Sequence, residues 1–348
     1  MKKILMIGPG RDVRGGISTV VNSYFELGIE KDTKIKYIPT MEDGSVLKKL
    51  FVAAKAYSVF CCCVKQYDIV HIHMAAQSSF VRKRLFIRRA KRAGVKIIIH
   101  SHAADFDKYY FEQSNEENRK KILDTFALVD CVIVLSEEWA DFFGKNICDP
   151  KKISILYNGV IVPETNKTDY SDHSVLMLGR LGERKGTYDL LKAIPMVLQA
   201  VPDAMFFLGG DGDIDVCKTL VEKEGVSDHV SFLGWIWGDD KEKLLKQCSI
   251  FTLPSYHEGM PMSVLEAMSH GLATVSTNAG GIPQIINDGE DGFRVEAGDI
   301  DALSNRIIEL LKDENLKRSI GRKAVQRVKE KFDIRVSYDK LLHIFQEV

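Results

Sequence analysis

The sequence predicts an α/β protein built from two doubly wound, Rossmann-like domains, each with a parallel sheet. Short apolar runs that end at glycine or a polar residue alternate with helical patterns along the whole chain. A polar segment at residues 163–173 divides this alternation into two halves of similar size. The length of 348 residues also favours two domains, at ~100–200 residues each.

The first half carries six apolar runs typical of buried parallel strands, with helical patterns between them. The predicted strands are 3–8, 34–38, 68–73, 95–100, 130–135 and 153–157. The predicted helices begin at Gly15-Gly16 and cover 47–65, 78–93 and 116–128.

The second half repeats the pattern after the expected linker at 163–173. The predicted strands are 174–179, 204–210, 230–234, 249–254 and 273–277. The predicted helices are 187–200, 216–224, 240–247, 261–270 and 283–287, followed by a turn at 288–292 and amphipathic patterns at 301–331 and 334–345. In such a chain a ligand usually binds at the carboxyl ends of the strands, here in a cleft between the domains.

Composition excludes several classes of protein. Lys plus Arg and Asp plus Glu both number 48, so no basic excess favours nucleic acid as a partner. The seven Cys include no C-x-x-C pair, which argues against a zinc ribbon or a dithiol redox site. With no apolar signal core near the start, we expect reduced thiols and a cytoplasmic protein. The longest apolar run, Leu50 to Val64, is shorter than the ~20 residues that span a bilayer.

Two cofactor motifs fail. G-x-G-x-x-G would bind a dinucleotide, but Val13 follows Gly8 and Gly10 in the third glycine position, and Asp215 follows Gly210 and Gly212. The acidic loop that starts at Asp211 resembles a calcium loop, yet Val216 replaces its turn glycine. We therefore expect no bound cofactor.

Two histidine pairs end neighbouring strands. His71 and His73 are expected to point to opposite faces, as are His100 and His102, with one of each pair near the cleft and one packed away. No carboxylate or third ligand is expected at metal-binding distance, so no metal site is predicted. His102 lies at the junction of strand and loop and is the functional candidate.

Two glycine-containing segments favour an anion. Gly15-Gly16 opens a helix, and free amides at a helix start suit an anionic group, although a plain tight turn is the alternative. The loop from Gly179 to Gly186 contains Arg180 and Lys185, which suit phosphate oxygens. A solvated charged loop is the alternative there.

The segment from Pro254 to Met268 carries the strongest signal. Glu258 precedes the predicted helix and Glu266 lies about two turns into it. At the helical rise the two carboxylates are separated by ~12 Å, too far for one acid/base pair. This spacing suits two contacts at opposite ends of an elongated ligand, such as a sugar and a ribose. The free amides at residues 260–262 would then face a phosphate.

These motifs together resemble the family 4 retaining glycosyltransferases of the GT-B fold. The resemblance rests on Glu258-x7-Glu266, Gly179-Arg180…Lys185-Gly186, Asn158-Gly159-Val160, Gly209-Gly210-Asp211-Gly212 and Gly280-Gly281-Ile282-Pro283. It implies an acceptor-binding domain at 1–165, onto which the last helix at 334–348 packs back, and a nucleotide-sugar-binding domain at 166–333. Two positions depart from the family pattern: Gly271-Leu272-Ala273 stands where the family usually has a Gly-x-Pro turn, and Gln284 stands where it often has glutamate.

The resemblance also implies roles for single residues. Glu258 would contact hydroxyls of the donor sugar, Glu266 the ribose, and Arg180 and Lys185 the diphosphate. Gly16 would approach the diphosphate from across the cleft, and His102 would lie near the donor sugar. The implied catalytic residues are His102, Arg180, Lys185 and Glu258. The implied donor-binding residues are Gly15, Gly16, Gly179, Gly210, Gly259, Met260, Pro261, Met262 and Glu266.

The expected activity is a metal-independent, retaining transfer of a sugar from a UDP- or GDP-sugar to a glycan or polyprenyl-linked acceptor, in surface polysaccharide synthesis. Two alternatives remain: a sugar-nucleotide epimerase of the same fold, and a catalytically silent partner subunit. An epimerase would release free products without an acceptor, and a silent subunit would not hydrolyse the donor.

A basic helix at 80–96 is expected to dock on an anionic membrane surface, which would make the enzyme peripheral on the inner face of the plasma membrane. Its cations are Arg82, Lys83, Arg84, Arg88, Arg89, Lys91, Arg92 and Lys96, interleaved with the apolar residues Phe80, Val81, Leu85, Phe86 and Ile87. The alternative is a solvated helix face.

Overall fold

The computed structural model describes residues 2–164 and 168–348, and its contacts divide the chain into two units. The N-terminal unit comprises Met1–Gly159 with Ile334–Val348, and the C-terminal unit comprises Val160–Asp333. The boundary expected between residues 165 and 166 lies outside the described residues.

The N-terminal unit is built on a six-stranded parallel sheet of order β2-β1-β3-β4-β5-β6. Its strands are β1 (Lys3–Gly8), β2 (Lys34–Pro39), β3 (Ile69–Met74), β4 (Lys96–Ser101), β5 (Cys131–Val134) and β6 (Ile153–Ile155). The central strands are buried almost throughout because helices cover both faces, which explains their near-continuous apolar sequence.

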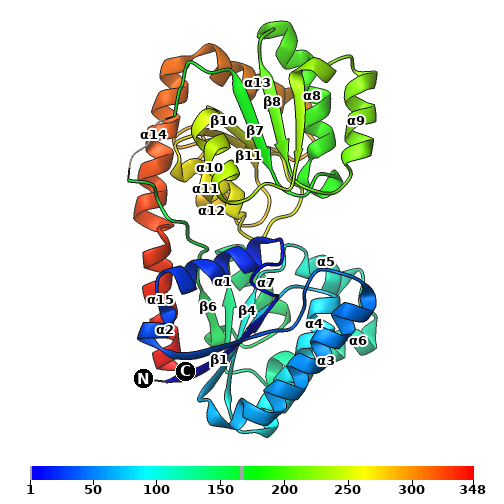
Figure 1. Cartoon of the computed structure of the whole chain (residues 1–348), viewed down its shortest axis with the longest axis vertical. Helices are drawn as coiled ribbons and strands as arrows, with labels where there is room; N and C mark the ends of the chain where they lie inside the picture. Colours follow the sequence, from blue (N-terminus) through cyan, green and yellow to red (C-terminus); the bar gives the residue numbers. More distant parts are fainter. Residues whose placement is uncertain (1, 165–167) are drawn as a thin grey trace. The chain divides into compact units, whose positions relative to one another are not determined.

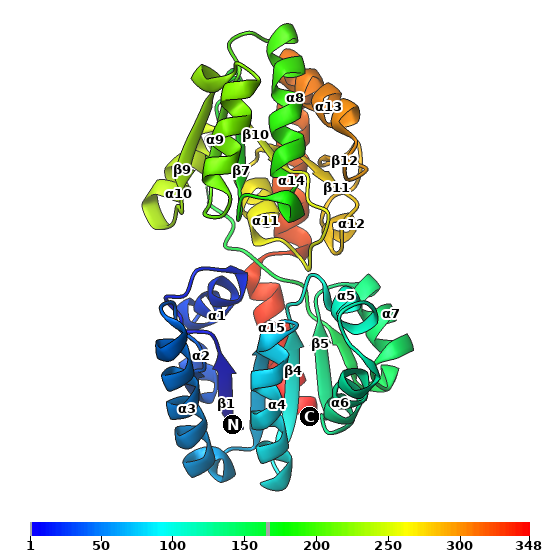
Figure 2. The ribbon, with the colours of Figure 1, turned by 90° about the vertical axis from the view of Figure 1, so that its right-hand side faces the viewer.

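The helices of this unit form two layers (Figures 1 and 2). They are α1 (Gly16–Glu26), α2 (Ile29–Asp32), α3 (Val46–Cys63), α4 (Ser78–Arg92), α5 (Phe106–Phe111), α6 (Glu116–Ala127), α7 (Glu137–Asn146) and α15 (Ile334–Glu347). Phe60, Phe86 and Phe126 bring α3, α4 and α6 into one apolar core with the sheet. On the other face α1 contacts α15, where the rings of Tyr24 and Tyr338 lie 6.4 Å apart.

The C-terminal unit has a second six-stranded parallel sheet, of order β12-β11-β10-β7-β8-β9. Its strands are β7 (Ser174–Leu178), β8 (Met205–Gly209), β9 (Val230–Gly234), β10 (Ile250–Leu253), β11 (Ala273–Thr277) and β12 (Phe293–Val295). Its helices are α8 (Thr187–Ala200), α9 (Ile214–Lys223), α10 (Gly238–Gln247), α11 (Met262–Ser269), α12 (Ile282–Ile285), α13 (Ile300–Lys312) and α14 (Glu314–Lys331).

The predicted fold class is confirmed, and the differences from the predicted elements are local. The pattern at 301–331 is two helices rather than one, because Asp313 leaves the helical conformation and its side chain caps α14 by accepting from the Leu316 amide at 2.9 Å. Sequence reasoning missed α2, α5, α7 and β12. The short elements have too few residues to show a periodic pattern. The start of α7 could have been predicted, because Ser136 caps the helix and two glutamates follow it.

The expected linker at 163–173 does not behave as a free connection where it is described. The Thr168 hydroxyl donates to the His270 carbonyl at 2.6 Å, and the Tyr170 hydroxyl donates to the Gly271 carbonyl at 2.9 Å. Tyr170 is buried. These residues therefore belong to the core of the C-terminal unit. Within the described residues, no helix combines the length and apolarity needed to cross a membrane.

Candidate functional site

The strand order of the C-terminal unit marks one place for a ligand. β7 and β10 are hydrogen-bonded neighbours, and the chain leaves them toward opposite edges of the sheet. In doubly wound sheets, ligands bind outside the carboxyl ends of the strands at such a reversal. The segment Gly179–Gly186 follows β7 and the segment from Pro254 to Pro261 follows β10, so the two predicted site segments meet at this point.

Glycines let the backbones of these loops approach closely. A Cβ on Gly210 would lie 1.8 Å from the carbonyl oxygen of Gly179, and one on Gly212 would lie 2.2 Å from that of Leu181. Both glycines have positive φ, at 157° and 111°. Gly186, with φ 67°, packs on the carbonyl of Pro254 in the same way, since a Cβ on Gly186 would lie 1.9 Å from that oxygen. The loop after β7 is thus fixed on both sides by contacts that only glycine permits.

Glu258 is the buried centre of the site. Its side chain is 5 % exposed, and its Oε1 accepts from Lys185 Nζ at 2.5 Å and from Ser255 Oγ at 2.7 Å. Gly280 packs against the Glu258 carbonyl, and the Gly281 amide donates to the Gly259 carbonyl at 2.8 Å. The predicted residues Lys185 and Glu258 are therefore in direct contact. Ser255 was missed, although its place between the strand and Glu258 is visible in the sequence.

The cations of the loop after β7 differ in their surroundings. Lys185 is mostly buried in its ion pair, whereas Arg180 is exposed and forms no ion pair among the described residues. The Arg184 guanidinium donates to the His257 carbonyl at 3.1 Å, and the Arg184 carbonyl accepts from the Tyr256 amide at 2.9 Å. Arg184 thus ties the two loops together, and Arg180 presents an unneutralised positive charge.

The start of α11 lies directly after Glu258. The helix begins at Met262, and Pro261 is its cap rather than part of its first turn, which corrects the predicted start by one residue. No side chain caps the first turn and no acidic residue occupies it. Gly259, Met260, Pro261 and Met262 are all buried. Pro261 has no amide hydrogen, so the donors predicted at residues 260–262 do not include it. The positive end of the uncapped helix is what this segment offers to an anion.

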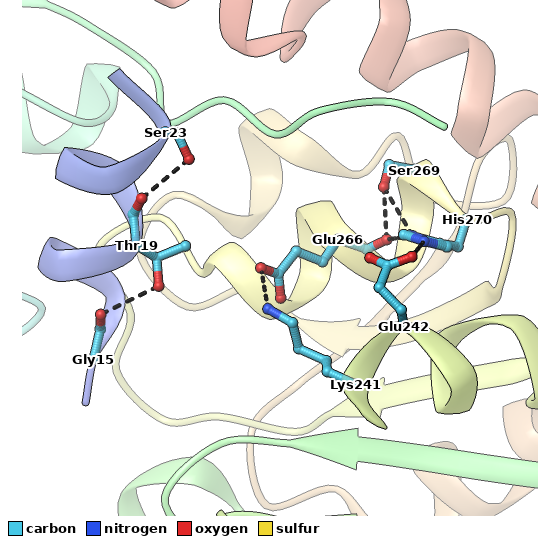
Figure 3. Close-up of polar contacts among 8 residues, drawn as sticks. All are labelled: Gly15, Thr19, Ser23, Lys241, Glu242, Glu266, Ser269 and His270. Carbon is cyan, nitrogen blue, oxygen red and sulfur yellow. Dashed lines mark hydrogen bonds and ion pairs between the residues drawn. The ribbon is translucent and has the colours of Figure 1, made fainter. Parts of the chain in front are cut away.

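Glu266 is half-buried on α11, where it pairs with a residue that sequence analysis did not predict. Lys241 Nζ on α10 donates to Glu266 Oε1 at 2.7 Å (Figure 3). On the next turn, His270 Nε2 lies 3.1 Å from Glu242 Oε2. The sequence could not single out Lys241, because α10 carries three lysines and only the packing of α10 on α11 brings one of them to Glu266.

The N-terminal unit holds the other predicted residues. Gly15 is the cap of α1 with φ 142°, and α1 has neither a capping side chain nor an acidic residue in its first turn. Its carbonyl accepts from the Thr19 hydroxyl at 3.3 Å (Figure 3). The same unit has a cavity of about 570 Å³. Its lining residues are Gly10, Arg11, Asp12, Val13, Tyr37, Pro39, Glu42, Asp43 and Lys48.

His102 directly follows β4, as expected for a strand-to-loop junction. Its Nε2 lies 2.9 Å from Nδ1 of His73 on β3. Desolvation by burial lowers the pKa of His102 to about 3, so the ring is neutral at pH 7. This places a neutral donor or acceptor at the carboxyl edge of the sheet.

The predicted orientation of the histidine pairs is wrong. Residues two apart on a strand share a face, and the rings of His71 and His73 lie 4.5 Å apart, those of His100 and His102 4.2 Å. The expectation that no third ligand sits at metal-binding distance is also wrong, since ring nitrogens of His71, His73 and His100 lie within 4.8 Å of one another. The strand pairing of His73 with His100 brings the two pairs together.

The predicted basic surface is smaller than the sequence suggested. Lys83 is 1 % exposed and donates to the Thr40 hydroxyl, so it belongs to the core. Phe80, Phe86 and Ile87 are buried as well. Lys96 is engaged by Asp130 at 3.1 Å. Of the residues named in the prediction, those exposed on α4 are Val81, Leu85, Arg88, Lys91 and Arg92.

The adjoining helix α3 adds an apolar surface. Its first two turns expose Val46, Leu47, Leu50 and Phe51, between 62 % and 79 % of each residue. In the later part of the predicted apolar run, Phe60, Cys63 and Val64 are buried in the core, whereas Val59 and Cys62 are exposed. α3 and α4 pack together through Phe60 and Phe86, whose rings lie 5.0 Å apart.

Comparisons with known proteins match both units. The description "Glycosyl transferases group 1" matches residues 158–327, and "Glycosyltransferase Family 4" matches residues 33–162. An Escherichia coli UDP-Gal:alpha-D-GlcNAc-diphosphoundecaprenol alpha-1,3-galactosyltransferase is 26% identical over 91% of this chain and 84% of its own length. The Bacillus anthracis N-acetyl-alpha-D-glucosaminyl L-malate synthase is 28% identical over 76% of this chain and 71% of its own.

Solved structures share the fold. HepE from Anabaena, in complex with UDP and glucose, has a TM-score of 0.81 with 18% identity, and all of both chains is covered. Sucrose-phosphate synthase from Thermosynechococcus elongatus has a TM-score of 0.80 with 18% identity, covering 100% of this chain and 99% of its own.

Proposed function

The chain belongs to the group 1 glycosyltransferases of the GT-B fold, and from that premise we propose that it transfers a sugar from a nucleotide-sugar donor to a glycan or lipid-linked acceptor, with retention at the anomeric carbon. The observation that carries the proposal is the buried contact of Lys185 with Glu258 at the reversal between β7 and β10. It joins a cation suited to phosphate with a carboxylate suited to hydroxyls.

The C-terminal unit would hold the donor along α11. Glu258 accepts hydrogen bonds from hydroxyls of the sugar, and Glu266 accepts from the ribose. The amides at the start of α11 face the diphosphate between them, where neither a cap nor an acid competes. On donor binding, Lys185 turns its charge from Glu258 to the phosphate, and the sugar hydroxyls take its place on the carboxylate.

The reaction breaks the bond between the anomeric carbon and the diphosphate oxygen, and it forms a bond from that carbon to the acceptor oxygen. The acceptor proton passes to the departing diphosphate on the same face of the sugar. Negative charge grows on the leaving group, so fixed cations and amides lower the barrier. Arg180 and Lys185 supply this charge, and the donor diphosphate then needs no divalent cation. Gly179, Gly210 and Gly259 keep the loops close enough for these contacts.

The N-terminal unit would contribute the acceptor site and further contacts to the transfer step. The free amides of Gly15 and Gly16 suit a phosphate, and the neutral His102 suits a hydrogen bond with a sugar hydroxyl. The cavity of this unit is lined in part by the charged side chains of Arg11, Asp12 and Lys48. A hydrated glycan acceptor fits such a lining better than an apolar ligand does.

The named relatives support a surface-polysaccharide pathway. The Escherichia coli relative is named for a diphosphoundecaprenol acceptor and UDP-Gal, and a relative from Erwinia amylovora is named for amylovoran biosynthesis. HepE was solved with UDP-glucose. We therefore expect a UDP-sugar, with a GDP-sugar as the second candidate, and a polyprenyl-linked or glycan acceptor.

A lipid-linked acceptor would require the enzyme to reach a membrane surface. The exposed apolar residues lie at the start of α3, after the carboxyl end of β2, and Arg88, Lys91 and Arg92 lie at the end of α4, before the amino end of β4. Both helices belong to one layer, and together they offer the apolar and cationic groups used in reversible docking on anionic lipid. Each cation near such a surface contributes ~1 kcal/mol. Docking through α3 and α4 would make the protein a peripheral enzyme on the cytoplasmic side.

The test is an assay of donor consumption by the purified protein with UDP-, GDP- and ADP-sugars, with and without a polyprenyl-diphosphate-linked sugar. We expect one donor to be consumed faster when acceptor is present, with a glycolipid product. Free sugar and nucleotide formed at one rate regardless of acceptor would favour an epimerase, and no consumption of any donor would favour a silent subunit. Either result would contradict the proposal.

A further inference from the structure

His71, His73, His100 and His102 form a cluster in the N-terminal unit, on the sheet face that α15 covers. His71 and His73 lie on β3, and His100 lies on β4 opposite His73. The ring of Phe345 on α15 packs edge-on against His71, with centroids 5.3 Å apart. Nitrogens of His71, His73 and His100 lie within 4.8 Å of one another. Three imidazoles from two adjacent strands therefore converge on one point in the core.

The nitrogens that converge are without partners. Among the described residues, both ring nitrogens of His71 and of His100, and Nε2 of His73, are buried with no hydrogen bond. The three residues are at most 1 % exposed. Buried polar atoms are nearly always satisfied, so five such nitrogens in one place call for an explanation. Burial also lowers the pKa of all three rings, which leaves them in the neutral form that binds metals.

We propose that His71, His73 and His100 bind a divalent transition-metal ion, zinc in the first place, at a buried site inside the N-terminal unit. Imidazole is a preferred ligand of zinc, and three histidines with one further position is a known zinc geometry. At Zn–N distances of ~2.0–2.1 Å, tetrahedral ligands are about 3.4 Å apart. Small rotations of the three rings would close the present separations. The proposal is independent of the donor chemistry proposed above.

The remaining nitrogen of His73 fits this assignment. A histidine that binds metal through one nitrogen usually donates its other N–H to an acceptor, which fixes the ring. His73 Nδ1 lies 2.9 Å from His102 Nε2. With metal on its Nε2, His73 donates from Nδ1 to His102, and the N–H of His102 is then on its Nδ1. The metal would thereby set the tautomer of a residue at the edge of the proposed site.

The competing explanation is a neutral histidine core without metal. The two explanations predict different effects when one of these histidines is replaced by an apolar residue. In an empty core, exchanging an orphaned imidazole for a leucine removes buried polar atoms and should leave the melting temperature unchanged or raise it. In a metal site, the same exchange removes a ligand and the metal is lost.

The experiment measures metal in the full-length protein produced in zinc-supplemented and in cobalt-supplemented medium, purified without a histidine tag. The variants are His71→Leu and His100→Leu, with His343→Gln as the control, since His343 is exposed on α15. The readouts are zinc per chain by mass spectrometry, the visible absorption of tetrahedral Co²⁺, and the melting temperature before and after dialysis against a chelator.

We expect close to one metal ion per chain in the wild type and in His343→Gln, and a loss of at least about tenfold in the leucine variants. His71→Cys keeps a ligand, so it should retain the metal and add a thiolate band to the cobalt spectrum, which decides the matter if the leucine variants fail to fold. Wild-type protein with no metal from either medium would overturn the proposal. So would a stoichiometric metal that persists in both leucine variants.

Discussion

The ammonium of Lys185 and the carboxylate of Glu258 lie 2.5 Å apart, with side chains only 13 % and 5 % exposed. They come from loops that follow two neighbouring strands, and Ser255 donates to the same carboxylate oxygen. A buried ion pair is costly to break, because removing one partner leaves an uncompensated charge. The pair therefore holds the two loops together, and donor binding would exchange its partners.

The first prediction concerns the stability of this pair. Lys185→Met should lower the free energy of unfolding by about 3–5 kcal/mol, because Glu258 is left buried without a cation. The double variant Lys185→Met/Glu258→Met should recover part of that loss, since neither charge remains. Urea denaturation monitored by circular dichroism measures both. A double variant less stable than either single variant would show that the pair is not coupled in this way.

The second prediction concerns the charge of the leaving group. Arg180→Ala should lower kcat by ~100–1,000-fold, as loss of one charge-stabilising donor typically does, with little change in melting temperature because Arg180 is exposed. Arg322→Ala is the matched control, an exposed arginine of α14 remote in sequence from the loop after β7. Steady-state kinetics under saturating donor measure the effect. Equal activity in the two variants would remove Arg180 from the mechanism.

The third prediction separates the two carboxylates. Glu266→Gln should weaken binding of the nucleotide diphosphate by about 10- to 100-fold, because a hydrogen bond to a charged acceptor is lost. Glu258→Gln should leave nucleotide binding nearly intact and lower kcat instead. Glu309→Gln, on the exposed side of α13, is the control. Calorimetric titration of each variant distinguishes them, and identical nucleotide affinities for the two site variants would refute the division of roles.

The fourth prediction concerns divalent cations at the diphosphate. Because Arg180, Lys185 and the α11 amides already supply positive charge, adding Mg²⁺ or Mn²⁺ to chelator-treated enzyme should not change the transfer rate. A metal held by the buried histidines is tested separately by metal content, so it does not confuse this measurement. A rate that rises with Mg²⁺ or Mn²⁺ and saturates would place a cation on the donor.

The fifth prediction concerns the surface of α3 and α4. The protein should sediment with phosphatidylglycerol vesicles and not with phosphatidylcholine, and binding should weaken with salt as screening shortens to ~3 Å at 1 M. Replacing Arg88, Lys91 and Arg92 by Ser should abolish it, as should Leu47→Ser with Leu50→Ser and Phe51→Ser. Arg89 is left in place because it donates to the Cys61 carbonyl.

The matched control for vesicle binding is the α14 triple variant Arg322→Ser, Lys323→Ser and Lys329→Ser, which removes as many exposed cations. It should bind like the wild type. Binding that is equal for both vesicle types, or equally reduced by the control, would contradict docking through α3 and α4.

The sequence predicts most strands and helices well because of how they are buried. Strands such as Ile4 to Ile7 and Ile97 to Ile99 carry apolar residues on both faces. A sheet needs such strands only when helices cover both of its faces, so the sequence pattern predicts that arrangement. The positions of the loop glycines and the interval from Glu258 to Glu266 could also be predicted from the sequence, because both depend only on residues close together in the chain.

What the sequence could not show depends on contacts between distant elements. The alignment of β3 with β4 decides that His73 lies beside His100. Lys83 looks like one more cation of a basic helix, and only its contact with Thr40, directly after β2, reveals that it is buried. Lys241 reaches Glu266 because α10 packs near α11. None of these contacts can be predicted from the periodicity of the sequence around either residue.

The central claim is that the C-terminal unit binds the nucleotide of a sugar donor through α11. The most direct measurement is the shift in melting temperature with UDP, GDP, ADP and their sugars, since a ligand at 100 times its Kd stabilises by ~2.7 kcal/mol. We predict that one nucleotide class stabilises the wild type and Glu309→Gln to the same extent, and Glu266→Gln clearly less. Stabilisation by no nucleotide, or equal stabilisation of Glu266→Gln, would contradict the account.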